Sequence, residues 1–403
     1  MRVRKKLDIA WSDLALAAAR TVLPGDAAAL ADGLEKRWSP HGDALACLSV
    51  RSGFDLLLQA LALPRGSEIL VSAVTIRDMV RIIEAHGLVA VPVELDMDSL
   101  SVRAEDLARR AGPRSAALLV AHLFGSRMPM EPLVRAARSR GLLVIEDCAQ
   151  AYAGPGYRGH DESDVSMFSF GPIKTATALG GALLRVRDAQ LRARMKRLQA
   201  GYARQTRAQY AARVAKYAGL KLLSGRVLYT LFVAGCRLLG KNHDAVIGGA
   251  TRSFAGAELL RAIRRRPCAA LLALLARRLR RFDPRAIEER IALARALFAR
   301  YPELARPGSR AALHTHWVVP VCSAAPDKLL RRLWRAGFDA TRGATSLYVV
   351  PPPPPEADRV MAQVVYVPLD RWMAAKALEA MGRIASRVDP VHAPAGKVMP
   401  KLG

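Results

Sequence analysis

Two stretches decide the fold of this chain: Val-Ile-Glu-Asp-Cys-Ala-Gln (144–150) and Val-Ser-Met-Phe-Ser-Phe-Gly-Pro-Ile-Lys-Thr (165–175). Each begins as an apolar run that has the length of a strand. Asp147 ends the first run, and Lys174 follows the second run after a turn marked by Gly171. In a largely parallel sheet, ligands bind beyond the carboxyl ends of the strands. We therefore expect Asp147 and Lys174 to face one site at one edge of such a sheet.

Apolar runs and helical segments alternate on both sides of these stretches. Strands are expected at 68–74, 89–95, 116–121, 142–147, 165–170 and 182–186, and helices at 52–63, 75–86, 104–110 and 130–140. Strands that are apolar throughout and joined by helices indicate a mostly parallel sheet with helices on both faces. The fold class is therefore predicted to be α/β.

The rest of the chain divides by composition. The expected order is an N-terminal arm with helices (1–45), an α/β domain (46–200), a helical segment with an amphipathic insertion (201–300), a small C-terminal α/β domain (301–390) and a loose tail (391–403). The small domain has strand signals at 316–321, 346–350 and 363–367 and helix signals at 327–336 and 374–387. The five prolines at 351–355 predict a stiff extended connector.

The composition limits the compartment and the partners. The five cysteines have no CxxC spacing, which argues against a zinc site or a disulfide framework and favours a reducing compartment. No secretory signal is evident, and the longest apolar run (227–236) is about half of the roughly 20 residues that span a membrane. We therefore expect a cytoplasmic protein without a metal.

The charge alone suggests polyanions. The net charge of +27 comes from 62 Lys and Arg against 35 Asp and Glu. Such an excess attracts phosphorylated substrates, anionic lipid or nucleic acid. Aromatic residues make up only 6% of the chain, and no helix-turn-helix, zinc-finger or RNA-recognition signature is present. Nucleic acid is therefore not an expected partner, whereas small-molecule substrates are.

Lys174 and Asp147 together indicate a chemistry. A lysine beyond a strand end can present an amine to a carbonyl cofactor, and an aspartate at another strand end can face a pyridinium nitrogen. Pyridoxal 5'-phosphate requires these two groups. Taken singly, each residue has a plainer interpretation, since surface lysines and helix-capping aspartates are common.

The motifs His-Leu-Phe-Gly (122–125), Ile-Glu-Asp-Cys-Ala-Gln (145–150) and Phe-Ser-Phe-Gly-Pro-Ile-Lys-Thr (168–175), in this order, resemble the DegT/DnrJ/EryC1/StrS family. Its members are fold-type-I pyridoxal-phosphate aminotransferases that act mainly on keto sugars linked to nucleotides. The resemblance covers 46–187 and continues more weakly to 365–369. It implies transfer of an amino group from a donor such as glutamate to a keto or aldehyde acceptor. It also implies a homodimer with active sites at the subunit interface.

The resemblance assigns roles to the polar residues at the strand ends. Lys174 would form the Schiff base with the cofactor and then shuttle a proton. Asp147 would hold the pyridine nitrogen protonated, and Gln150 would contact the phenolic oxygen of the ring. His122 would line the pocket, although a histidine at a strand end can equally be a structural residue.

The phosphate of the cofactor would be bound where a helix begins. The resemblance implies that Ser169 contacts it together with Arg51, Ser52 and Gly53, since the N-terminus of a helix favours anions. The partner subunit of such proteins lends an asparagine to this phosphate, for which Asn242 is the candidate.

Several positions depart from the family pattern. Ile76 follows Thr75 where an aromatic residue often stacks on the pyridine ring, Gly171 stands where histidine is common, and Leu-Gly-Gly (179–181) replaces Glu-Gly-Gly. These changes keep two alternatives open: another pyridoxal-phosphate reaction such as elimination, decarboxylation or carbon–carbon bond formation, and a non-catalytic regulatory protein. The segment 216–240 looks like an insertion that could contact a membrane, although packing against the core or a partner subunit is the more common role of such a segment.

Overall fold

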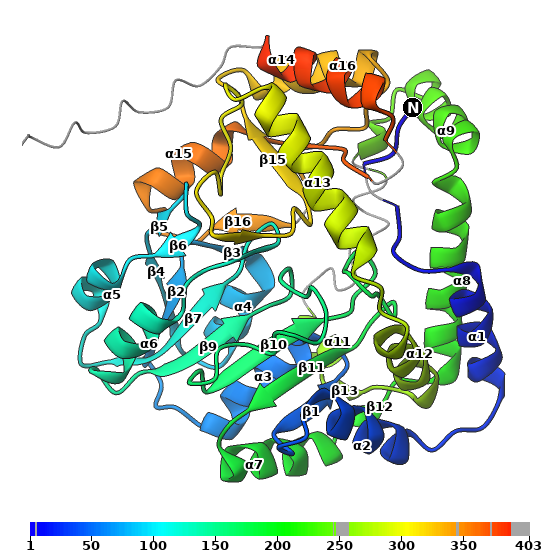
Figure 1. Cartoon of the computed structure of the whole chain (residues 1–403). Coiled ribbons are helices and arrows are strands. Elements are labelled where there is room, and N and C mark those ends of the chain that lie inside the picture. The colour runs from blue at the N-terminus through cyan, green and yellow to red at the C-terminus, as the bar shows by residue number, and fades with distance from the viewer. Residues whose placement is uncertain (5, 245, 247–257, 344–345, 371–372, 388–403) are drawn as a thin grey trace, which may run out of the picture.

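The computed structural model describes residues 1–4, 6–244, 246, 258–343, 346–370 and 373–387 (Figure 1). Its centre is a seven-stranded sheet in the order β1-β11-β10-β9-β7-β2-β4. The strands are β1 (Ala44–Cys47), β2 (Glu68–Ser72), β4 (Val89–Val93), β7 (Ser115–Ala121), β9 (Leu143–Asp147), β10 (Val165–Ser169) and β11 (Ala182–Val186). The strands from β10 to β4 run parallel, whereas β11 and β1 are antiparallel to their neighbours. The predicted α/β fold with a mostly parallel sheet is confirmed, and β1 adds an edge strand that the sequence analysis did not identify.

Helices cover both faces of this sheet. One face carries α3 (Val50–Leu61), α4 (Arg77–Ala85) and α7 (Ala189–Ala200), and the other carries α5 (Ala104–Arg110) and α6 (Glu131–Arg138). Ile69 packs against the first layer and Leu70 against the second. Because successive side chains of a strand point to opposite faces, both must be apolar here. This explains why the strands are continuous apolar runs in the sequence.

A second set of helices covers the sheet where β10, β11 and β1 lie. These helices are α1 (Trp11–Val22), α2 (Ala27–Trp38), α8 (Arg207–Leu223) and α12 (Ala269–Arg280). In Figure 1, α1 lies alongside α8. Helix α8 begins at a capping box, in which Thr206 and Gln209 each accept a hydrogen bond from the backbone of the other. Its C-cap is Ser224, and Gly225 is the N-cap of the next helix, α9 (Arg226–Leu238).

Among the residues that the structure describes, no single helix is both long and apolar enough to span a membrane. Helices α8 and α9 meet that criterion only when they are counted as a pair, and the pair is bent by 94°. The segment 216–240, which the sequence suggested as one amphipathic unit, is therefore divided between two helices at Ser224 and Gly225.

The C-terminal part packs around a small antiparallel sheet. It contains β15 (Val319–Cys322), β17 (Val364–Val367), α13 (Arg285–Arg300), α14 (Pro326–Arg335) and α16 (Ala375–Ser386). Buried residues of these elements form a core of their own. The strand signal at 346–350 corresponds to β16 (Leu347–Val349), which does not join this sheet. It pairs instead with β3 (Val74–Ile76), next to the large sheet.

The proline run is only partly an extended connector. Pro355 is the first residue of α15 (Pro355–Gln363), a helix that the sequence analysis missed. Proline is common at this position because its fixed φ suits a helix start and its missing N–H would have no intrahelical partner there. The predicted tail at 391–403 lies outside the described residues.

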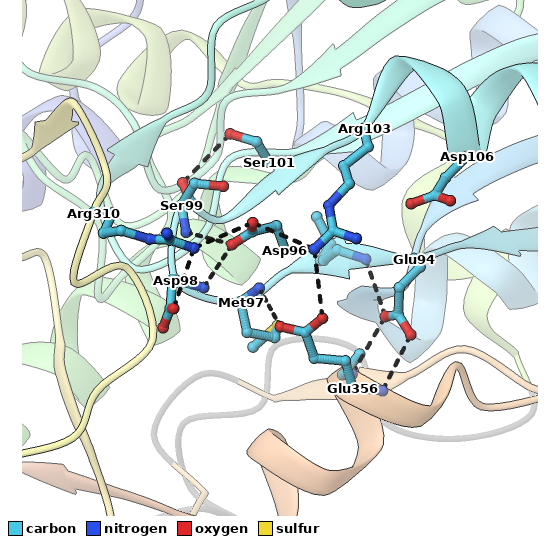
Figure 2. A network of polar contacts seen from close by, with 12 residues as sticks. Glu94, Asp96, Met97, Asp98, Ser99, Ser101, Arg103, Asp106, Arg310 and Glu356 are labelled. Atoms are coloured by element: carbon cyan, nitrogen blue, oxygen red, sulfur yellow. Dashed lines mark hydrogen bonds and ion pairs between the residues drawn. The ribbon is translucent and has the colours of Figure 1, made fainter. Parts of the chain in front are cut away.

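Polar contacts join α15 to the loop beside the large sheet (Figure 2). The Met97 N–H donates to Glu356 Oε1 (3.1 Å), and the Glu356 N–H donates to Glu94 Oε2 (3.1 Å). Arg310 forms an ion pair with Asp96 across the same junction (3.5 Å). Met97 follows the short strand β5 (Leu95–Asp96), which pairs with β6 (Ser101–Val102). These contacts fix the C-terminal part against the sheet.

Short pairings complete the fold. They join β8 (Ser126–Arg127) to β14 (Leu313–His314) and β12 (Ala203–Arg204) to β13 (Arg265–Arg266). The short helix α11 (Leu259–Ile263) precedes β13 and packs on α3. The β8–β14 pair brings the segment before β15 next to the end of β7, where a cavity opens.

Candidate active site

Asp147 and Lys174 lie in one cavity. Asp147 is the last residue of β9, and Lys174 lies in the loop that connects β10 to β11. Both line a cavity of about 780 Å³ at the carboxyl ends of the parallel strands. This is the location at which α/β sheets place their ligands.

Burial perturbs both groups. Desolvation raises the pKa of Asp147, and the Ala149 N–H (2.9 Å from Oδ1) and the charge of Lys174 only partly oppose this effect. Desolvation lowers the pKa of Lys174 to about 8, against the opposing influence of Asp147. A larger share of this amine is therefore neutral near pH 7 than in an ordinary lysine. Perturbed groups of this kind are typical of functional sites.

An indole ring holds the lysine in place. Lys174 Nζ lies 4.4 Å from the centre of the Trp317 ring, a cation–π geometry. The Trp317 Nε1–H donates to the Ile173 carbonyl (3.2 Å), which fixes the ring against the lysine loop. The sequence analysis did not identify Trp317 as a site residue. The unusual cluster His-Thr-His-Trp (314–317) before a strand was the available signal.

Gln150 presents a donor to the cavity. Its side-chain oxygen accepts the Phe124 N–H (2.7 Å), so the amide NH₂ is the end left to donate into the cavity that Gln150 lines. This orientation suits the predicted contact with a phenolic oxygen.

His122 is held by the protein on both ring nitrogens. Nε2 lies 2.9 Å from Glu146 Oε2, and Nδ1 accepts the Met128 N–H (3.2 Å). The side chain is buried at the wall of the cavity. Glu146 also accepts hydrogen bonds from Tyr157 Oη (2.6 Å) and from a backbone N–H. The hydrogen bond from His122 lowers the pKa of Glu146 to about 2, although burial acts in the opposite direction. With both nitrogens bonded, His122 has the surroundings of a structural residue that supports the Asp147 strand.

The predicted phosphate cradle is only partly brought to the cavity. Ser169 and Arg51 line it, and Arg51 Nε also pairs with Asp78 Oδ2 (2.6 Å). Ser52 is not among the lining residues, because its hydroxyl bonds to Ser49, the N-cap of α3 (2.9 Å). The start of α3 thus reaches the cavity through 49–51.

Gly53 serves packing rather than the cavity. Its N–H bonds to the Ser49 carbonyl within the helix (3.0 Å), and it is not among the described residues that line the cavity. A Cβ at this position would lie 2.7 Å from Leu184 Cδ1 of β11. The glycine therefore allows α3 to pack closely on the sheet.

Other side chains complete the cavity wall. Ile76, the N-cap of α4, lines it, and in the β3–β16 pair the neighbouring Thr75 faces Tyr348. Tyr348 and Tyr366 supply the aromatic surface there. Arg213 of α8 also reaches this cavity, where it donates to the Leu179 carbonyl (3.2 Å). The sequence analysis missed these three residues because strand pairing and helix packing bring them in from distant segments.

A second cavity, of about 580 Å³, meets the first at Lys174. Arg290 of α13 lines it, and its Nε donates to the Thr315 carbonyl (2.8 Å). Its Nη2 is buried and has no hydrogen-bond partner in the described part of the chain. Burial lowers the pKa of Arg290 to about 10, against the opposing influence of the Asp8 charge. No ion pair between Arg290 and a carboxylate is present among the described residues, so the arginine presents a positive charge with an unbonded donor.

Two other cations of this second cavity, Arg4 and Arg278, are paired with carboxylates. Arg4 bonds to Asp339 (2.8 Å), and Arg278 bonds to Asp13 (2.7 Å) and Asp8 (3.0 Å). A buried cation without a carboxylate is costly unless an anion approaches it. The geometry around Arg290 is therefore suited to an anionic ligand beside Lys174.

Asn242, the candidate for the asparagine of a partner subunit, lies exposed after α9, where its oxygen accepts the Asp244 N–H (2.9 Å). Its role toward a second subunit stays a prediction.

The fold matches that of solved structures. It matches the aminotransferase TlmJ from Streptoalloteichus hindustanus with a TM-score of 0.69 at 18% identity, over 96% of this chain and 98% of that one. At this identity the likeness concerns the fold, which is that of the fold-type-I transferases.

Part of the chain matches a known family in sequence. Residues 30–223 match the DegT/DnrJ/EryC1/StrS aminotransferase family. The chain is also similar to the GDP-perosamine synthases of Escherichia coli O157:H7 (33% identical over 139 residues, 34% of this chain) and Caulobacter vibrioides (31% over 159 residues, 39% of this chain). The matches span 38% and 43% of the length of these two relatives.

Proposed function

We propose that this protein is a pyridoxal-phosphate-dependent aminotransferase that transfers an amino group from a donor such as glutamate to a keto or aldehyde acceptor. The observation that carries the proposal is the buried Lys174 amine, with its lowered pKa, in the same strand-end cavity as Asp147. The family match of residues 30–223 supports the same conclusion.

The residues present fit this cofactor. The Asp147 carboxylate is buried and receives one hydrogen bond from the described residues, from Ala149. A buried carboxylate with spare acceptor capacity suits the protonated nitrogen of a pyridine ring. Gln150 has a donor for a phenolic oxygen, and the start of α3 with Arg51 and Ser169 suits a phosphate.

When bound, pyridoxal phosphate supplies an electron-withdrawing ring that stabilises the charge left when a proton leaves the carbon beside the amino group. Asp147 contributes a negative charge that keeps the ring nitrogen protonated. Lys174, whose pKa of about 8 lies near the working pH, can accept and return a proton at its amine Nζ. Trp317 holds that amine at the point where the two cavities meet.

The second cavity suggests an anionic substrate. Arg290 has an unpaired charge that a phosphate or carboxylate would neutralise, and it borders the same space as Lys174. A keto sugar linked to a nucleotide carries such phosphates, and the curated relatives are GDP-perosamine synthases. We therefore include nucleotide-linked sugars as the proposed acceptor class and a homodimer as the proposed assembly.

A half-reaction tests the proposal. The protein loaded with pyridoxal phosphate is mixed with glutamate and other amino donors, and the absorbance of the cofactor is followed. Transamination should bleach the yellow form and leave the amine form of the cofactor, while a later addition of a keto acid should restore it. Lys174→Ala should keep the fold by circular dichroism yet lose the reaction, by at least about 10³-fold.

The same experiment separates the other reaction types. Loss of the yellow form with release of carbon dioxide, or turnover without the amine form of the cofactor, would show decarboxylation or elimination instead. An unchanged spectrum with every donor would contradict an aminotransferase.

A further inference from the structure

Helix α9 has two apolar faces. One faces inward and is buried, and it comprises Tyr229, Val233 and Cys236. The other faces outward, and it comprises Val227, Leu231, Ala234 and Leu238. At 3.6 residues per turn, the spacing of three and four residues places these four side chains on one stripe. Val227 is 72% exposed, Leu231 62% and Leu238 89%.

Neighbouring segments enlarge this apolar surface. Leu222 at the end of α8 is 59% exposed, and Leu239 after α9 is 72% exposed. Trp11 of α1, 53% exposed, lies with its ring 5.6 Å from Lys221 Nζ, near the turn between the two helices. We call the outward stripe together with Leu222, Leu239 and Trp11 the elbow surface. Exposed apolar side chains gathered in this way mark interaction sites.

The segment that contains α8 and α9 has charged side chains of one sign. No Asp or Glu occurs between Asp188 and Asp244, whereas the 55 residues in between contain twelve Lys and Arg. Arg226 and Arg237 lie eleven residues, or about three turns, apart on α9, so they share one flank of the exposed stripe. Chains of this composition are attracted to anionic surfaces.

A helix with apolar and basic strips is typical of a segment that lies in the plane of a membrane interface. The bend of 94° between α8 and α9 presents the elbow as a protruding corner, at the side of the molecule where α1 also lies (Figure 1). Tryptophan and long basic side chains are favoured at the headgroup level of a bilayer.

A second copy of this chain fits the elbow surface less well. Symmetric pairing would bring together two copies of a segment that contains Arg226 and Arg237 and no carboxylate. An anionic bilayer instead neutralises these charges while it covers the leucines.

We propose that the elbow surface docks the protein on an anionic phospholipid bilayer. Leu231 and Leu238 enter the boundary between headgroups and acyl chains, and Arg226 and Arg237 contact lipid phosphates. The inner side of the same elbow, through Leu223, lines the cavity that contains Lys174. Docking therefore brings that cavity close to the lipid surface, whichever reaction the site performs.

Vesicle co-sedimentation tests the docking. The full chain with its cofactor is incubated with vesicles of phosphatidylcholine mixed with phosphatidylglycerol, or of phosphatidylcholine alone. Binding should require phosphatidylglycerol and weaken as salt is added. Leu231→Ser and Leu238→Ser should each lower the binding constant on the order of tenfold. Arg226→Gln with Arg237→Gln should also weaken binding, again on the order of tenfold because each basic residue near the surface contributes.

Matched controls separate the elbow surface from general stickiness. Val89→Ser and Leu313→Ser change exposed apolar side chains elsewhere, and they should bind vesicles like the unaltered protein. All variants should retain the cofactor spectrum and the melting behaviour of the parent. No vesicle binding, or equal binding to both vesicle types, would overturn the proposal. Dissociation of an oligomer by Leu231→Ser and Leu238→Ser in sedimentation velocity would overturn it too, by showing a subunit interface.

Discussion

The two cavities that meet at Lys174 are built in different ways. The cavity with Asp147 takes its polar groups from the ends of neighbouring parallel strands and from the start of α3. The cavity with Arg290 is assembled from the N-terminal arm, the α8–α9 elbow, α13 and the segment before β15. The first is rigidly positioned by the sheet and suits a resident cofactor. The second depends on packing between distant segments and suits the variable part of a substrate.

The largest expected effect concerns the sheet side. Asp147→Asn removes the negative charge that keeps the ring nitrogen protonated, so kcat for amino transfer should fall on the order of 10²–10³-fold. Steady-state kinetics measures this loss. Asp164 precedes β10 at the amino end of the strand, away from the cavity, and pairs there with Arg138 (2.9 Å). Asp164→Asn should therefore keep kcat. Equal losses in the two variants would remove the special role of Asp147.

A smaller effect is expected on the substrate side. Arg290→Gln removes the unpaired charge, so KM for an anionic substrate should rise roughly tenfold to hundredfold while kcat changes little. Arg300→Gln on the same helix is exposed and serves as the matched control. If KM stays constant and kcat falls instead, Arg290 acts on the reacting groups and the division between the two cavities is wrong.

The pH dependence sharpens the electrostatic difference further. Because burial lowers the pKa of Lys174 to about 8, acylation of its amine in the cofactor-free protein should accelerate about tenfold per pH unit below pH 8 and level off above it. The hydrogen bond to Asp32 raises the pKa of Lys36, so acylation of Lys36 should continue to accelerate beyond pH 10. Peptide mass spectrometry after a short pulse of reagent measures both lysines together. Parallel curves for the two lysines would contradict the lowered pKa.

The smallest effect is expected where the C-terminal part meets the sheet. Glu356→Ala removes the acceptor of the Met97 N–H and should lower the free energy of unfolding by about 1 kcal/mol, with unchanged kcat. Glu379→Ala, which breaks an exposed pair with Arg383 (2.9 Å), should cost less. Denaturant titration compares them. A rise in KM for Glu356→Ala would show that this junction also shapes the Arg290 cavity.

The sheet and the shared cavity of Asp147 and Lys174 could be predicted, because continuous apolar runs identify buried strands and both residues follow the carboxyl ends of such strands. The pairing of β16 with β3 could not, since a short strand signal carries no information about its neighbour. Arg290 was missed for a related reason. It is one of many arginines, and only the packed structure shows that it lacks a carboxylate.

Gly53 has a packing role that the sequence did not reveal. The resemblance implied a phosphate contact at residues 51–53, which stays a prediction, and the structure shows that Gly53 also allows the contact of α3 with Leu184. The segment 216–240 was correctly identified as helical, although it forms parts of two helices. The break at Ser224 and Gly225 could not be read from the sequence. Only the structure shows that Tyr229 is buried, and therefore that the opposite stripe of α9 faces outward.

Reduction with borohydride tests the central claim most directly. Protein loaded with pyridoxal phosphate is reduced, digested and mapped by mass spectrometry, with Lys174→Ala treated in parallel. We predict a single stable cofactor adduct on Lys174 and no adduct in the variant. An adduct on another lysine, or none on a protein that retains the bound cofactor, would contradict the account.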